Sequence, residues 1–170
     1  MQPEQAKFLL GFLLPQLKSE QMITKKILSA IPPDQGEYQP DPKCMSSFKL
    51  AWHLAATEMW FLDAVIDLVF KEDDSPMPSG LKTGGDVARW YDENFALRIP
   101  RLEALSGEHL ITPVDYIGLR NDPAVAYLSL AIRHSVHHRG QLSAYLRPMG
   151  AKVPAIYVES ADESVTTVPL

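Results

Sequence analysis

Four segments with helical periodicity, separated by loops rich in proline and glycine, limit how this chain of 170 residues can fold more than any other feature. The first segment starts near Pro3 and stops before Pro32, because proline suits the first turn of a helix and blocks its continuation. The second begins at Ser46 or Ser47, either of which is a good N-cap, and runs to about Phe70. Few polar residues interrupt the second segment, so we expect it to be the most buried helix.

The third segment follows Thr83, and Asp86 three residues later completes the pattern of a capping box. We expect this helix to continue as far as Gly107, where glycine acts as a stop signal. The stretch 108–121 that follows is predicted to be a loop with room for a short extended piece.

The fourth segment is predicted to have Asp122 as its N-cap and Pro123 in its first turn, and to end before Pro148. Residues 151–170 show no helical period. The pattern predicts an all-α fold, an up-and-down four-helix bundle that forms a single domain over residues 1–170, with 151–170 as a non-helical tail.

Composition excludes several classes of protein. The formal net charge is −5 and lysines and arginines form no basic stripe, which argues against a general nucleic-acid binder. No apolar run is long enough to span a bilayer, and a single cysteine allows no internal disulfide. We therefore expect a cytoplasmic protein without a membrane or nucleic-acid partner.

The fourth segment concentrates histidines where a bundle should be apolar. Placed on a helix, His134 and His138 share one face, one turn apart, and Tyr127 and Gln141 lie on the same face. His137 lies toward the flank. Two imidazoles side by side in an interior are costly unless their nitrogens have partners, and a metal ion provides a partner for both.

A third ligand is expected from another helix, and His53 is the one histidine of the apolar second segment. Packing of the second and fourth helices could bring it opposite the pair. The alternative is that these histidines bind nothing and form hydrogen bonds within the core, for example with Gln141 and Tyr127.

The stretch "HSVHHRGQLSAYLRPMG" resembles the fourth-helix signature of the DinB/YfiT-like family, H-x-x-x-H-R-G-Q. "LAWHLAATEMWFLDAV" is similar to that family's second helix with its single histidine, and "KVPAIYVESADE" to its ending. The resemblance implies a four-helix bundle, often a homodimer, that holds a divalent metal ion through three histidines. On this sequence they are His53, His134 and His138. The metal could be Zn, Ni, Fe or similar, since imidazole suits all of them.

Relatives in that family include S-transferases that use low-molecular-weight thiols. The resemblance therefore implies a metal-dependent thiol transferase acting on a small thiol and an electrophile. A metal-dependent hydrolase, or a non-catalytic, stress-associated protein that binds a metal or small molecule, are the alternatives.

No catalytic side chain is assigned. Glu58 lies roughly 140° round the helix from His53, so it is poorly aimed as a general base. Arg139 points away from the ligand face and is expected to form a salt bridge. The expected neighbours of the three ligands are Gln141, His137, Thr57 and Tyr127.

Overall fold

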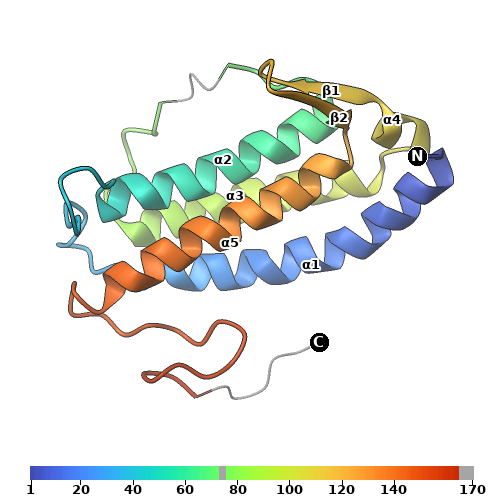
Figure 1. The fold of residues 1–170 in the computed structure, drawn as a ribbon. Helices are drawn as coiled ribbons and strands as arrows, with labels where there is room; N and C mark the ends of the chain where they lie inside the picture. Colours follow the sequence, from blue (N-terminus) through green and yellow to red (C-terminus); the bar gives the residue numbers. More distant parts are fainter. Residues whose placement is uncertain (73–75, 165–170) are drawn as a thin grey trace.

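The computed structural model describes residues 1–72 and 76–164. Four long helices make up the body of the molecule: α1 (Pro3–Ser29), α2 (Ser47–Asp67), α3 (Gly84–Glu103) and α5 (Ala126–Leu146) (Figure 1). The predicted all-α four-helix bundle is confirmed.

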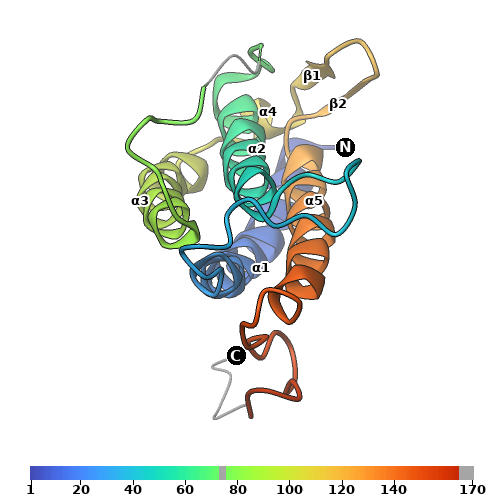
Figure 2. The same cartoon turned by 90° about the vertical axis from the view of Figure 1, so that its left-hand side faces the viewer.

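The four helices form a ring in which α2 lies between α3 and α5, and α1 packs on the other side of the same two helices (Figure 2). Along the bundle, α2 and α3 run in one direction and α1 and α5 in the other (Figure 1). Sixteen residues (68–83) separate α2 from α3, which is enough chain to return along the length of a helix, because extended chain can cover about 3.3 Å per residue and a helix rises only about 1.5 Å per residue. As a result α5 packs directly against α2, although they are the last and second long helices of the chain.

Two of the predicted helix starts are confirmed at the level of individual hydrogen bonds. The Ser46 hydroxyl accepts a hydrogen bond from the backbone N–H of Lys49 and caps α2. At α3, Thr83 Oγ1 accepts from the Asp86 N–H (3.2 Å) and the Asp86 carboxylate accepts from the Thr83 N–H (3.0 Å). This reciprocal pair satisfies two donors that a helix start leaves free.

Between α3 and α5 the chain forms a short helix, α4 (Gly107–Ile111), and a hairpin of β1 (Pro113–Tyr116) and β2 (Arg120–Pro123). Gly107 therefore begins a helix, and the prediction that it stops the third one is wrong; α3 already ends at Glu103. A side chain at position 107 would meet the Pro3 carbonyl oxygen at 2.4 Å, so glycine serves a close approach to α1 here.

The predicted start of the fourth helix is also wrong. Asp122 pairs with Val114 and Pro123 with Pro113 in the hairpin ladder, and α5 begins after Val125, which provides no side-chain cap. Asp-Pro is a helix-start pattern, but here strand pairing determines its conformation.

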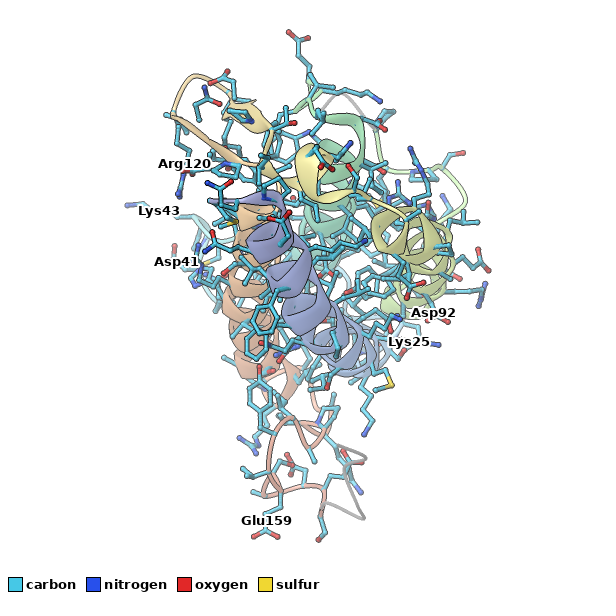
Figure 3. All side chains as sticks on the ribbon, turned by 90° about the vertical axis from the view of Figure 1, so that its right-hand side faces the viewer. Lys25, Asp41, Lys43, Asp92, Arg120 and Glu159 are labelled. Atoms are coloured by element: carbon cyan, nitrogen blue, oxygen red, sulfur yellow. The ribbon has the colours of Figure 1, made fainter. Side chains whose placement is uncertain are left out.

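Beyond α5, residues 151–164 contain neither helix nor strand, while 165–170 of the predicted tail lie outside the described residues. Figure 3 shows Glu159 of this segment at the end of the molecule opposite Arg120 of the hairpin. Lys25 and Asp92 lie together in the same view, and their 2.6 Å ion pair joins α1 to α3. Within the described part of the chain, no helix has both the length and the hydropathy to cross a membrane.

Candidate metal centre

Three histidines from two helices meet where α2 packs against α5. His53 comes from α2, and His134 and His138 come from successive turns of α5. Their ring centroids lie 4.4–5.0 Å apart, and one ligand nitrogen from each residue lies within 4.8 Å of the others. The juxtaposition predicted from the helical spacing is present.

The Nε2 atoms face one another at a spacing that fits a shared cation. His53 Nε2 lies 3.2 Å from His138 Nε2 and 3.2 Å from His134 Nε2. A tetrahedral ion with metal–nitrogen bonds of about 2.0–2.1 Å would separate its ligands by about 3.3–3.4 Å. The residues present therefore fit a divalent ion, with at least one coordination position left for water or a substrate.

Hydrogen bonds on the outer nitrogens orient two of the rings. Gln141 Oε1 lies 2.7 Å from His138 Nδ1, and because a carbonyl oxygen only accepts, Nδ1 carries the proton. The lone pair of His138 is then on Nε2, which faces the cluster. Thr57 Oγ1 lies 3.3 Å from His53 Nδ1 and supports that ring from the next turn of α2. Gln141 and Thr57 therefore contact the outer nitrogens of His138 and His53, where they could orient the two rings.

His134 has a different environment. Its Nδ1 is buried and has no hydrogen-bond partner among the described residues, and its ring packs against Phe61. Burial, followed by the neighbouring imidazoles of His138, His53 and His137, lowers the pKa of His134 to about 3. Burial also lowers the pKa of His138, although its hydrogen bond to Gln141 opposes this. Both rings are therefore neutral near pH 7, the form that binds a metal.

The other predicted neighbours lie differently. His137 is exposed, and its ring contacts that of His138 at 4.8 Å without joining the group of converging nitrogens. Tyr127 has a structural role instead: its hydroxyl donates to the Val114 carbonyl (2.7 Å) and accepts from the Asp122 N–H. The hairpin holds Tyr127 at the start of α5, about two turns from His134.

Sequence reasoning predicted a salt bridge for Arg139 but missed the buried Glu58–Ser135 pair behind the cluster. Glu58 is 1% exposed and accepts a hydrogen bond from the Ser135 hydroxyl, and burial raises its pKa to about 7. It therefore faces the bundle interior, as its angle from His53 indicates. Arg139 is also 1% exposed and forms the expected salt bridge, with Glu20 of α1. Ser135 and Arg139 are four residues apart and therefore lie on the same face of α5. Two polar residues on a face that is otherwise apolar were the sequence feature that could have indicated a buried polar network.

The family model of the DinB family matches residues 6–167. In Bacillus subtilis, the uncharacterized protein YrdA is 24% identical over 143 residues (82% of this chain, 83% of YrdA), and YjoA is 26% identical over 137 residues (78% of this chain, 85% of YjoA). A DinB-like protein from Bacillus cereus ATCC 10987 has a solved structure with a TM-score of 0.72 at 24% identity, covering 85% of this chain and 95% of that one. The crystal structure of YjoA gives a TM-score of 0.69 at 24% identity, with 84% and 95% covered. The bundle, its fourth-helix histidines and the length of the match together place this chain in the DinB family.

Proposed function

We propose that this protein binds one divalent metal ion through the Nε2 atoms of His53, His134 and His138 and uses it to activate a small molecule. The observation that carries the proposal is that His53 Nε2 lies 3.2 Å from both His134 Nε2 and His138 Nε2, and that the rings of His134 and His138 are neutral near pH 7. His138 Nε2 carries a lone pair because its Nδ1 carries the proton, and a divalent cation would accept lone pairs from all three converging nitrogens at once.

The reaction class that fits best is transfer of a low-molecular-weight thiol to an electrophilic small molecule. A bound divalent cation supplies the charge that converts a thiol to its thiolate. Hydrolysis would need a general base within reach, and the nearest carboxylate on α2, Glu58, is turned into the core toward Ser135. Thiol activation asks for no such base, so it ranks above hydrolysis.

Within this function, Gln141 and Thr57 are the orienting groups. Gln141 fixes the tautomer of His138 by accepting its Nδ1–H, and Thr57 holds the ring of His53. The ring of Phe61, 5.8 Å from that of His134, forms an apolar wall on one side. Substrate would approach from the side of the cluster that these residues leave open.

The test compares purified wild-type protein with His53→Ala after incubation with Zn²⁺, Ni²⁺, Fe²⁺ or Co²⁺ and removal of excess metal. We expect about one ion per chain in the wild type and loss of stoichiometric binding in His53→Ala. His109→Ala is the matched control, because His109 bonds the Val65 carbonyl (2.8 Å) and lies outside the cluster. Absence of metal from the repleted wild type would defeat the proposal.

Assays with panels of thiols and electrophiles then separate an enzyme from a binder. Turnover that requires both the thiol and the metal supports a transferase. Stoichiometric metal without turnover across a broad panel would favour the non-catalytic binding protein instead.

We also propose that the chain forms a homodimer through α1. Phe8 and Phe12 are 78% and 61% exposed and lie one turn apart on the same strip of that helix. Exposed aromatic pairs of this kind are typical of interfaces between protein chains. Light scattering should give the mass of a dimer for the wild type and of a monomer for the double variant Phe8→Ser/Phe12→Ser; a monomeric wild type would contradict the proposal.

A further inference from the structure

Each histidine that α5 contributes to the cluster is followed directly by a buried polar side chain. Ser135 follows His134 and Arg139 follows His138, and both are 1% exposed. Because successive helical residues are 100° apart, Ser135 and Arg139 point into the bundle while the histidines point toward His53. The two sets of side chains therefore share the same two turns of backbone.

Arg139 fastens its turn of α5 to α1. Its Nη1 donates to the Glu20 carbonyl oxygen (3.2 Å) and to Thr24 Oγ1 (3.2 Å), and its Nη2 pairs with the Glu20 carboxylate. Nη2 also donates to the Tyr157 hydroxyl (2.6 Å), which reaches in from the segment after α5. These partners surround the guanidinium, so the position of Arg139 is fixed in several directions at once.

Ser135 fastens the preceding turn of α5 to α2, the helix that carries His53. Its hydroxyl donates to Glu58, which is itself 1% exposed. The carboxyl therefore has no access to water, and losing this partner would leave a buried polar group unsatisfied. α5 is thus tied to α1 and to α2 within one turn, and Figure 2 shows it packed between the two.

A small rotation of α5 about its axis would displace the ligand nitrogens further than a metal site tolerates. An imidazole Nε2 lies about 6 Å from the helix axis, so a 10° rotation of α5 would move it by about 1 Å. Metal–ligand distances tolerate only about 0.2 Å. Apolar packing permits rotations of this size more readily than a hydrogen-bonded network does.

We propose that Arg139 and Ser135 are positioning residues that set the rotation of α5, so that His134 and His138 meet His53 at metal-binding distance. This inference rests on the proposed metal-binding function. It assigns to the two residues a role beyond stability, exerted through the histidine that precedes each.

The experiment measures Co²⁺ affinity by competition with a chelator, and the visible absorption of the bound Co²⁺, for Arg139→Met and Ser135→Ala. We expect each variant to bind Co²⁺ about 10-fold or more weakly and to show an altered spectrum. Arg139→Lys, which keeps the charge and part of the donor set, should recover part of the loss.

Arg98→Met is the matched control. Arg98 of α3 also makes a close ion pair between helices, with Asp63 of α2 (2.6 Å), but neither residue adjoins a ligand histidine. The control should be less stable than the wild type and yet bind Co²⁺ with wild-type affinity and spectrum. All measurements are made where urea titration shows each variant to be folded, so that lost stability alone does not change the affinity.

Wild-type affinity and spectrum in folded Arg139→Met and Ser135→Ala would overturn the positioning role while leaving the metal site intact. If Arg139→Met does not fold, Arg139→Lys and Ser135→Ala decide the question on the same readouts. Failure of the wild type to bind Co²⁺, Zn²⁺ or Ni²⁺ would instead overturn the proposed function, and the positioning role with it.

Discussion

The two sides of α2 carry partly buried polar groups that are partnered in different ways. Toward α3, Asp63 and Arg98 form a two-pronged ion pair with distances of 2.6 and 2.9 Å. This pair borders a cavity of about 160 Å³ whose walls include Trp52, Trp60 and Trp90. Toward α5, three imidazoles of the same chemical kind face one another instead.

The two sides of α2 differ in where their polar groups find partners. A carboxylate and a guanidinium complete each other's hydrogen bonding, so the α3 side needs nothing from outside the chain. Imidazoles that converge through Nε2 can instead supply their lone pairs to one shared cation. The α3 side therefore contains an ion pair whose two members satisfy each other, whereas the α5 side has the arrangement that the proposed metal site requires, although both sides belong to one helix.

The largest expected effect comes from replacing one imidazole with an apolar side chain. His134→Leu should weaken metal binding by at least about 100-fold, because it removes a ligand outright. The same change should stabilise the metal-free protein by about 1 kcal/mol, since the unpartnered Nδ1 is buried beside Phe61. Metal titration and urea unfolding measure the two effects; a destabilised apo variant would contradict the view that the cluster costs stability.

Breaking the ion pair between Arg98 and Asp63 should lower the stability of the protein and leave metal binding unchanged. Arg98→Met leaves the Asp63 carboxylate without its partner and should lower the free energy of unfolding by about 2–3 kcal/mol. Metal stoichiometry should not change. A variant that loses metal while still folded would show that the two sides of α2 are coupled.

The pH dependence of stability separates two groups within the α2–α5 contact. The pKa of Glu58 is raised from 4.5 to about 7, so its contribution is complete below pH 4.5 and lost as the pH rises through 7. The lowered pKa of His134 acts in the opposite sense: its contribution is present above pH 6.5 and lost as the pH falls toward 3.

Glu58→Gln should therefore remove most of the loss of apo stability between pH 5 and 8, a change of about 2 kcal/mol. Urea midpoints measured across that range test this. An unchanged slope in the variant would show that Glu58 does not titrate there.

The smallest expected effect is at the outer edge of the cluster. Gln141→Ala removes the acceptor of the His138 Nδ1–H and should weaken metal binding about tenfold, with little effect on stability because Gln141 is exposed. Gln141→Glu keeps an acceptor and should retain the affinity. Equal affinity in wild type and Gln141→Ala would assign the orientation of His138 to packing alone.

Much of this molecule could be predicted from residue patterns, because the relevant forces are local. The capping box at Thr83 and the one-turn spacing of His134 and His138 depend only on helix geometry. The errors arose where a distant partner decided the outcome. The local pattern of Asp122 and Pro123 indicates a helix start. In the structure these residues instead pair with Val114 and Pro113 in the hairpin, and this pairing determines their conformation.

The hydrogen-bonded partners of Arg139 and Ser135 could not be predicted for the same reason. Arg139 could be assigned a salt bridge from its angle on the helix. That its partner is Glu20, 119 residues earlier, depends on the packing of α5 against α1. The hydrogen bond between Ser135 and Glu58 likewise could not be predicted from the sequence, because it depends on how α5 packs against α2.

The separation of the ligands along the chain determines when the cluster can exist during synthesis. His53 and His138 are 85 positions apart, and α5 follows the other helices of the described residues in the chain. At 5–20 residues per second, a nascent chain carries His53 for roughly 4–17 s before its partners emerge from the ribosome. A cation could be bound by all three rings only after α5 has docked, so metal uptake would report the docking of α5.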